Sequence, residues 1–240
     1  MKAIVCGANG AMGKLICARL EGELAGKVSI DRENGVPGTF EELGAVDHDV
    51  LIDFSHHSAV GDVLAYAMAA GSAVVIGTTG HTHEEKQQIL DAAEKIPVFF
   101  SGNMSLGIAV LCKLAAQAAS FFPDADIEIL EIHHNRKVDA PSGTARMLFD
   151  AIQAVRPEAV DHCGRAGEGK REKKEIGISS LRMGNVVGVH EVHIHTENQS
   201  LTLRHDAGSR GMLADGAVDA ARFMVGKTAG LYTMAELLEG

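Results

Sequence analysis

A short apolar strand, a glycine-rich loop and a helix open the chain, and this unit constrains the fold more than any other feature. The strand is predicted at Lys2–Cys6 and the helix extends through Leu20, with Gly7, Gly10 and Gly13 spaced between them. This GxxGxxG spacing is a variant of the dinucleotide fingerprint, whose glycines permit a tight turn, close approach of backbone to pyrophosphate, and close packing of helix on strand. The candidate dinucleotide-binding residues are Gly7, Asn9, Gly10, Ala11, Met12 and Gly13.

Strands and helices alternate after this loop. Strands are predicted at Lys27–Ile30, Val50–Phe54, Ala73–Ile76 and Val98–Phe100, and helices at Ser58–Ala70 and His83–Ile96. The alternation predicts an α/β fold with a Rossmann-type, doubly wound parallel sheet, whose ligands bind at the carboxyl ends of the strands. The loops at those ends supply further cofactor candidates: Asp31, Arg32, Gly77, Thr78, Thr79 and Asn103.

Asp31 and Arg32 leave the identity of the dinucleotide open. Asp31 lies about twenty residues beyond the glycines, where an acid can hydrogen-bond the adenosine ribose hydroxyls. Arg32 follows directly, and a guanidinium at this place can pair with a 2′-phosphate. The two side chains favour NAD and NADP respectively, and each is also compatible with a simple turn. The sequence therefore predicts NADH, NADPH or both as cofactor.

Composition excludes several classes of partner. The 240 residues are 46% hydrophobic, enough for one large domain or two modest ones. A net charge of −10 without a basic stripe argues against nucleic acid and anionic membranes as partners. We expect no signal peptide before the first strand, and no apolar run reaches the ~18 residues needed to span a bilayer. The four cysteines lack metal-ligand spacing, and we expect reduced thiols in a cytoplasmic protein.

A second domain is predicted in the later part of the chain. The apolar helix Met104–Phe122 is expected to leave the first domain, and Met212–Val225 to return to it. Between them, strand-like runs at Lys174–Met183, Val186–Glu197 and Leu201–Asp206 are expected to pair antiparallel. The sequence thus predicts a dinucleotide-binding domain over residues 1–104, completed by 212–240, and a smaller α+β domain with a mixed or antiparallel sheet over 105–211.

The stretch Glu131–Ala145 places titratable and cationic side chains in one short segment. His133 and His134 follow a predicted apolar strand, and imidazoles are frequent general acids because they titrate near neutral pH. Lys137 adds a positive charge beside them. Each residue alone is more often a solvated surface residue, but their combination indicates a site that donates protons to an anionic ligand.

A predicted helix start adjoins these side chains. Pro141 disfavours helical geometry at the residue before it, and Ser142 is a natural N-cap, so the helix should begin at Gly143. The backbone N–H groups of Gly143 and Thr144 would then lie at the positive end of the helix dipole. Such a terminus binds carboxylate or phosphate.

Metal and serine-hydrolase sites are less well supported. Glu191, His193, His195 and Glu197 share one face of a predicted strand and offer zinc ligands. Such alternation more often marks the solvent-facing or subunit-facing side of a half-buried strand, so we predict no metal. No Gly-x-Ser-x-Gly elbow occurs at a strand–helix turn, which disfavours a hydrolase.

The stretch Glu131–Ala145 resembles the signature of the 4-hydroxy-tetrahydrodipicolinate reductase (dihydrodipicolinate reductase) family of bacterial lysine and diaminopimelate biosynthesis. The matching pattern is Glu-x-His-His-x-x-Lys-x-Asp-Ala-Pro-Ser-Gly-Thr-Ala. The resemblance extends over nearly the whole chain. Its further segments are Gly7–Gly13, Gly77–Gly80, Asn103–Gly107, Gly164–Gly167, Arg182–Gly184, Val187–His190 and Ser209–Arg210.

The resemblance implies an NAD(P)H-dependent reduction of a small dicarboxylate, 4-hydroxy-tetrahydrodipicolinate, to tetrahydrodipicolinate. It implies His133 as proton donor, assisted by Lys137, and a homotetramer built through the sheet of the second domain. Ala11 stands where many members carry arginine, which removes one cation near the adenosine phosphate. The residues implied to hold the substrate's carboxylates are His134, Lys137, Ser142, Gly143 and Thr144. The resemblance also implies that Ser101, Gly102 and Asn103 line the cofactor.

Two alternative functions remain open at this level. Another two-domain NAD(P)-dependent dehydrogenase of an aspartate-derived substrate would share the glycine loop, but does not explain the histidine pair joined to the helix start. A non-catalytic protein that senses NAD(P)H would need the loop, but has no use for a proton donor beside an anion site.

Overall fold

The computed structural model describes every residue from Met1 to Gly240, and the chain divides into two compact units. Unit 1 comprises Met1–Leu106 and Gly211–Gly240, and unit 2 comprises Gly107–Arg210. Unit 1 is therefore completed by a C-terminal segment that follows the whole of unit 2. None of the helices is long and apolar enough to cross a lipid bilayer.

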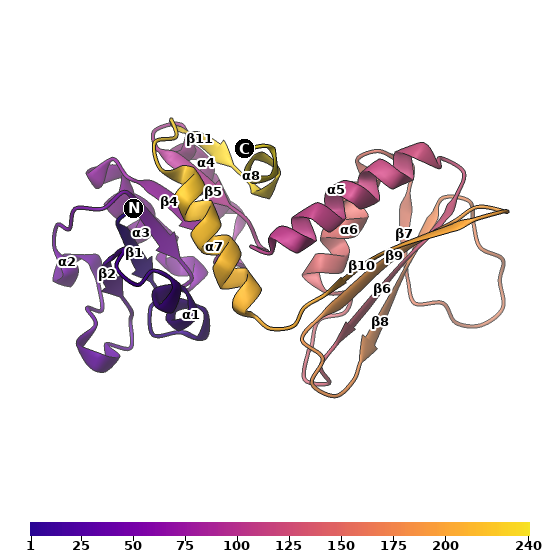
Figure 1. Cartoon of the computed structure of the whole chain (residues 1–240), viewed down its shortest axis with the longest axis horizontal. Helices are drawn as coiled ribbons and strands as arrows, with labels where there is room; N and C mark the ends of the chain where they lie inside the picture. Colours follow the sequence, from indigo (N-terminus) through magenta and orange to yellow (C-terminus); the bar gives the residue numbers. More distant parts are fainter. The chain divides into compact units, whose positions relative to one another are not determined.

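Unit 1 contains a six-stranded sheet in the order β11-β5-β4-β3-β1-β2 (Figure 1). The strands are β1 (Ala3–Cys6), β2 (Leu24–Val28), β3 (Val50–Asp53), β4 (Ala73–Ile76), β5 (Pro97–Phe100) and β11 (Gly230–Tyr232). All neighbouring strands are parallel. The strands β1, β3 and β4 are buried along their whole length, as expected when both faces of a parallel sheet are covered. The predicted doubly wound sheet is confirmed.

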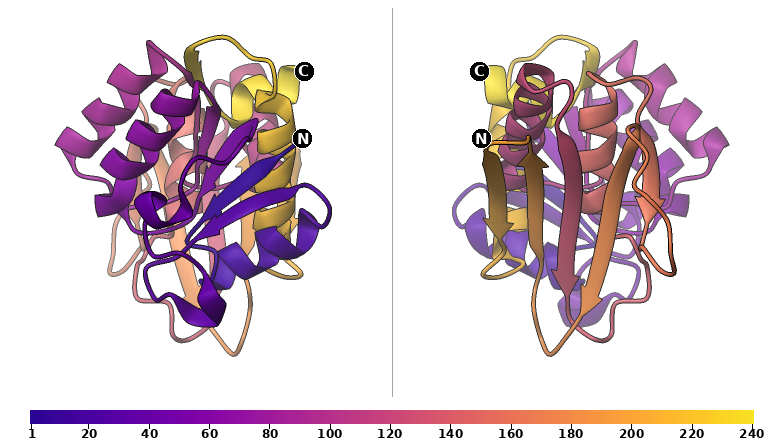
Figure 2. Two further views of the ribbon diagram at one scale, coloured as in Figure 1. Left: turned by 90° about the vertical axis from the view of Figure 1, so that its left-hand side faces the viewer. Right: turned by 90° about the vertical axis from the view of Figure 1, so that its right-hand side faces the viewer.

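Helices cover both faces of this sheet (Figure 2, left). The helices α3 (Val60–Ala70) and α4 (His83–Ala93) enclose the core on one face. The helices α1 (Ala11–Arg19) and α7 (Gly211–Met224) pack together on the other. Shorter helical pieces are η1 (Glu33–Gly35), α2 (Phe40–Leu43), η2 (His57–Ala59) and α8 (Met234–Glu239).

Unit 2 contains a five-stranded mixed sheet in the order β10-β9-β6-β8-β7 (Figure 2, right). The strands are β6 (Asp126–His133), β7 (Val160–Cys163), β8 (Glu175–Arg182), β9 (Val189–His195) and β10 (Ser200–Asp206). The helices α5 (Leu106–Phe121) and α6 (Gly143–Gln153) lie over one face and bury its apolar side chains. We call the opposite face of this sheet, which carries Leu130, Ile132 and Leu181, the open face.

The strand pairing in unit 2 differs from the expectation that three late strands pair antiparallel. The strand β9 is antiparallel to both β10 and β6. The strand β8, however, runs parallel to β6, and β6 separates it from β9. The earlier strand β6 occupies the centre of the sheet, where both of its edges are paired.

The second strand of unit 1 also lies elsewhere than expected. It was predicted at Lys27–Ile30, but β2 ends at Val28 and begins at Leu24, where it pairs with Ala3. Ile30 lies beyond the strand and is 93% exposed. The predicted strand extended too far because Ile30 is apolar, although it lies in the turn that follows the strand.

Candidate active site

The glycine loop brings α1 close to β1. A side chain at Gly13 would collide with the carbonyl oxygen of Gly7, so only glycine allows this approach. Helix α1 begins after Gly10, and no side chain caps its N-terminus. Backbone N–H groups at an uncapped helix start bind anions, and the pyrophosphate of a dinucleotide fits this arrangement.

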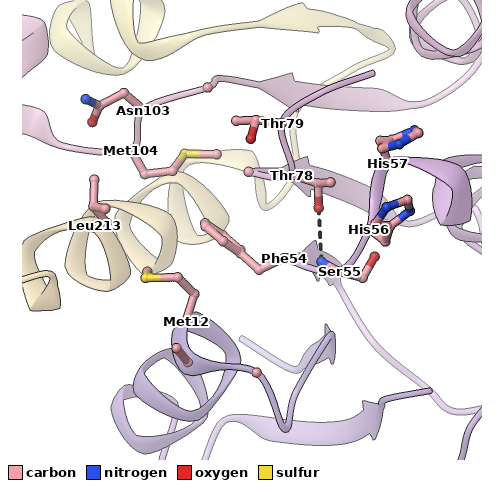
Figure 3. A pocket seen from close by; sticks show the side chains of 14 residues that line it. Met12, Phe54, Ser55, His56, His57, Thr78, Thr79, Asn103, Met104 and Leu213 are labelled. Carbon is pink, nitrogen blue, oxygen red and sulfur yellow. Dashed lines mark hydrogen bonds between the residues drawn. The ribbon is translucent and has the colours of Figure 1, made fainter. Parts of the chain in front are cut away.

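A cavity of about 420 Å³ lies beside this helix start, within unit 1 (Figure 3). The predicted cofactor residues that line it are Gly10, Ala11, Met12, Gly77, Thr78, Thr79, Gly102 and Asn103. Those that do not line it are Gly7, Asn9, Gly13, Asp31, Arg32 and Ser101. The rest of the wall was not singled out from the sequence: Phe54, Ser55, His56, His57, Met104 and Leu213.

Part of this wall follows directly from the strand-end rule. Phe54 and the residues up to His57 come immediately after β3, at the edge where ligands of parallel sheets bind. A side chain on Gly77 would overlap the ring of Phe54, so the small residue after β4 accommodates this aromatic side chain. Leu213 comes from α7, and no sequence signal connected that helix with the cavity.

A buried carboxylate supports the cavity wall from behind. Asp53 is 1% exposed, and its oxygens accept hydrogen bonds from Ser55 Oγ (2.5 Å) and Thr78 Oγ1 (2.6 Å). Burial raises the pKa of Asp53 although these hydrogen bonds act in the opposite direction. The backbone N–H of Ser55 also donates to Thr78 Oγ1, at 3.0 Å (Figure 3). The loops after β3 and β4 are therefore tied together at the cavity.

Asp31 and Arg32 lie outside the cavity lining and contact other parts of unit 1. Asn9 Nδ2, in the glycine loop, donates to Asp31 Oδ1 at 2.5 Å, and this hydrogen bond lowers the pKa of Asp31. Arg32 instead forms an ion pair with Glu42. The second oxygen of Glu42 accepts the N–H of Gly38, at 2.7 Å. Asp31 thus contacts the glycine loop, whereas Arg32 is paired with Glu42.

The central strand of unit 2 carries the second candidate site. Glu131 and His133 project from the same face of β6, because residues two apart in a strand share a face. Arg182 on β8 lies opposite His133, and His190 on β9 lies opposite Glu131. Three strands therefore converge on one cluster of polar side chains beneath α6.

Glu131 is the best-connected member of this cluster. It is fully buried, and Arg182 donates to both of its carboxylate oxygens, at 2.9 and 2.8 Å. His133 Nδ1 lies 2.5 Å from one oxygen, and the N–H of Ser142 lies 3.1 Å from the other. Burial alone would raise the pKa of Glu131, but hydrogen bonds from Arg182, Ser180 and His133 outweigh it and hold the pKa at about 2. Glu131 is therefore an anion at neutral pH.

His190 is a second imidazole packed edge-on against His133, with 5.1 Å between ring centroids. It is buried, and its Nε2 lies 3.2 Å from Ser142 Oγ. Burial, together with the charge on His133, lowers the pKa of His190 to about 4. His190 is therefore neutral at neutral pH and contributes no positive charge to the site.

The helix start predicted beside the histidines forms as expected. Helix α6 begins at Gly143, and Ser142 Oγ accepts the N–H of Ala145 at 3.2 Å. Gly143 is exposed, and Thr144 is half-buried.

The other basic residues of the predicted site occupy the loop between β6 and α6. Lys137 Nζ forms an ion pair with Asp139, at 2.8 Å. Burial and the nearby cations Arg136 and Arg210 lower the pKa of His134. The structure thus brings His133 and Ser142 together around Glu131, while Lys137 is bound to Asp139.

Three members of the cluster were not among the predicted site residues: Glu131, Arg182 and His190. Strand periodicity places Glu131 beside His133 and could have identified it. Arg182 and His190 depend on which strands flank β6, and a single sequence does not determine that pairing.

Comparison with known proteins links both units to one family. A family model described as the N-terminus of dihydrodipicolinate reductase matches residues 1–104, and a model of its C-terminus matches residues 107–238. A 4-hydroxy-tetrahydrodipicolinate reductase of Alkaliphilus metalliredigens is 41% identical over 242 residues, covering 99% of both chains. One from Campylobacter jejuni is 40% identical over 242 residues, again covering 99% of both.

Solved structures give a consistent result. A dipicolinate-bound dihydrodipicolinate reductase from Paenisporosarcina sp. TG-14 superposes with a TM-score of 0.80 and 26% identity, covering 97% of each chain. An amine dehydrogenase from Mycobacterium smegmatis shares the fold, with a TM-score of 0.64, 14% identity, and coverage of 98% of this chain and 95% of that one.

Proposed function

The chain belongs to the dihydrodipicolinate reductase family, and on that premise we propose that it reduces 4-hydroxy-tetrahydrodipicolinate to tetrahydrodipicolinate with NADH or NADPH. The observation that carries the proposal is the pairing of two sites in one chain. Unit 1 has a cavity beside an uncapped helix start, and unit 2 has an imidazole held by a buried carboxylate. The reaction belongs to lysine and diaminopimelate biosynthesis, and we assign the protein to the cytoplasm.

The residues of unit 1 fit a dinucleotide. The glycine loop allows the backbone to approach a pyrophosphate, and the loops after β3, β4 and β5 line the cavity at the edge where nicotinamide binds in this fold. When bound, the reduced nicotinamide supplies the hydride. The chain's own contribution is to orient that cofactor, through backbone groups and through Phe54 and Thr78 at the cavity wall.

The residues of unit 2 fit a dicarboxylate that must gain a proton. We assign the start of α6, at Ser142, Gly143 and Thr144, to one carboxylate, because helix N-termini bind anions. His134 and Lys137 are assigned to substrate binding in the adjacent loop. His133 is assigned as the proton donor, and Lys137 as the cation that stabilises negative charge developing on the substrate after hydride transfer.

The open face of the unit 2 sheet supports the proposal of a homotetramer. Leu130 and Ile132 are only half-buried there, and Leu181 is 44% exposed. Glu191, on the same strand face as His193, accepts hydrogen bonds from His193 and Arg204. An apolar centre within polar surroundings is typical of a subunit interface.

The test is the loss of nicotinamide absorbance, with substrate generated in situ by a dihydrodipicolinate synthase and with NADH and NADPH assayed in parallel. We expect the wild type to oxidise the cofactor and His133→Gln to reduce turnover by about two orders of magnitude or more, which is within the range of general acid catalysis. His83→Gln, at an exposed position at the start of α4, is the matched control and should retain full turnover. Cofactor binding without oxidation would exclude the reductase and favour a sensing protein.

A further inference from the structure

We propose that Glu131, clamped by Arg182, is the positioning residue of the proton donor: it binds Nδ1–H of His133 and leaves Nε2 as the atom that delivers the proton. The inference rests on the proposed function for the identity of the proton acceptor. The geometry of the three side chains supports it independently of the substrate.

Glu131 cannot change its position easily. Arg182 engages both carboxylate oxygens in a two-pronged arrangement, the strongest and most directional form of this ion pair. The N–H of Ser142 binds one of the same oxygens, so the start of α6 also fixes the carboxylate. A fully buried carboxylate with this many donors has a single stable orientation.

The fixed carboxylate determines how His133 is protonated. A carboxylate can only accept, so the ring nitrogen 2.5 Å away, Nδ1, must carry a hydrogen. In the neutral ring the hydrogen therefore lies on Nδ1 and Nε2 is bare, while in the protonated ring both nitrogens carry one. Only the hydrogen on Nε2 is then available for transfer, because Glu131 holds the other.

The surroundings of Nε2 contain space where a side chain would otherwise lie. Gly188 faces this nitrogen, and a Cβ on residue 188 would lie 3.1 Å from Nε2 and 3.5 Å from Cδ2 of the same ring. His133 is 9% exposed, so it has only a narrow opening. His190 packs edge-on against the ring and stays neutral. Glu131 therefore occupies Nδ1, whereas the glycine at position 188 keeps a side chain away from Nε2.

The proton transfer balances without another reagent. The N–H bond at Nε2 of the protonated ring breaks, and its electron pair stays on the nitrogen. The 4-hydroxyl of the substrate first leaves as water together with a hydrogen of the neighbouring carbon, which gives the unsaturated dihydro form. This form receives the hydride, and the proton from Nε2 then forms a new bond to the hydride adduct. The ring becomes neutral and keeps its hydrogen on Nδ1 against Glu131, and solvent restores the proton at Nε2 before the next cycle.

A double-mutant cycle separates positioning from a general structural role. We expect Glu131→Gln to reduce kcat by about 10- to 100-fold while the KM for substrate changes less than about threefold, since the carboxylate acts through His133. In a His133→Gln background the same substitution should cause no further loss. Equal losses in both backgrounds would contradict the proposal. Glu131→Asp, which keeps the charge, should recover part of the activity.

Nitrogen-15 NMR of histidine-labelled protein tests the protonation pattern without substrate. The His133 signals are assigned by their absence in His133→Gln. We expect neutral His133 to carry its hydrogen on Nδ1 in the wild type, and the Nε2 form to appear in Glu131→Gln. A wild-type ring with its hydrogen on Nε2 would overturn the proposal even if the chain proves to be a reductase. If the protein shows the expected hydrogen positions but does not oxidise NAD(P)H, the positioning role of Glu131 stands and only the proposed reaction is wrong.

Loss of the carboxylate leaves Arg182 without its partner, and breaking a buried ion pair is strongly destabilising. Glu131→Gln combined with Arg182→Met removes both charges and serves as the second variant. Its folding is checked by circular dichroism and by binding of pyridine-2,6-dicarboxylate. We expect this folded double variant to show the same loss of kcat and the same change in the NMR signals of His133. Wild-type kcat in this variant would refute the role of Glu131.

Discussion

At the scale of single residues, the ion pair between Arg32 and Glu42 bears on the choice of cofactor. Arg32 can pair with a 2′-phosphate only if it leaves Glu42, which also accepts the N–H of Gly38. Asp31 meanwhile remains beside the glycine loop, bound to Asn9, and an acid at this place repels a phosphate. We therefore expect a preference for NADH over NADPH.

The preference should weaken in Glu42→Gln. An exposed ion pair contributes about 0.2–1 kcal/mol, so freeing Arg32 should raise the ratio of kcat/KM for NADPH to that for NADH by roughly 1.5- to 5-fold. Glu41→Gln, one residue away and equally exposed, should leave the ratio unchanged. An unchanged ratio in Glu42→Gln would show that the ion pair does not restrain Arg32.

His190 should make the stability of unit 2 depend on pH. Its pKa of about 4 in the folded chain lies below the unfolded value near 6.5, so folding favours the neutral ring. The resulting stabilisation is fully present above pH ~6.5 and is lost as the pH falls through 4, with about 3 kcal/mol as the upper limit. The contribution of Glu131, whose pKa is lowered from 4.5 to about 2, is fully present above pH 4.5 and is lost as the pH falls through 2.

Urea unfolding between pH 4 and pH 7 measures this effect. We expect the free energy of unfolding to fall less steeply with acid in His190→Gln than in the wild type. The control His83→Gln, at an exposed site, should follow the wild-type curve. Parallel curves for the wild type and His190→Gln would mean that folding does not lower the pKa of His190.

Residue types in sequence predicted part of the candidate site. The glycine spacing, Asp31 and the histidine pair are local patterns, and each indicated its chemistry without knowledge of the fold. The partners of those residues were not predictable in the same way. Sequence alone made Arg32 a candidate ligand of a 2′-phosphate, but in the structure it pairs with Glu42. The carboxylate of Glu131 is fixed beside His133 by Arg182, which comes from a distant strand, β8.

At the scale of elements, the start of α6 joins stability and binding. Ser142 caps the helix and contacts His190 and Glu131. We expect Ser142→Ala to cost about 1 kcal/mol of unfolding free energy through loss of the cap, and also to weaken the binding of pyridine-2,6-dicarboxylate. Thr233→Ala removes a comparable cap from α8 and should cost stability without changing that affinity. If Ser142→Ala and Thr233→Ala bind pyridine-2,6-dicarboxylate equally well, the start of α6 is not part of the substrate site.

Some elements of the fold depend on adjacent residues and others on residues far apart in the chain. The first residue of α6 was predicted correctly because capping depends on adjacent residues such as Pro141 and Ser142. The neighbours of β6 were not, because strand pairing joins residues far apart in the chain. The strands β7 and β11 were missed altogether: the first lacks an apolar alternation, and the second is three residues long.

At the scale of the whole molecule, the open face of the unit 2 sheet predicts the assembly. We expect light scattering to give four times the chain mass of 25.3 kDa. Leu130→Asp places a charge at the centre of the proposed interface and should yield smaller species. Leu90→Asp, at an exposed position of α4 in unit 1, is the control and should leave the mass unchanged. A wild-type monomer would contradict the tetramer.

The alternation of side chains along β6 has an evolutionary consequence. Glu131 and His133 face the helices, while Leu130 and Ile132 face the opposite way, and neighbours pair with this strand on both edges. Inserting or deleting a single amino acid here would exchange the two sets and remove the polar cluster and the apolar open face in one event. Gains and losses of chain length in related genes should therefore accumulate in segments such as 164–174, leaving the length of β6 constant.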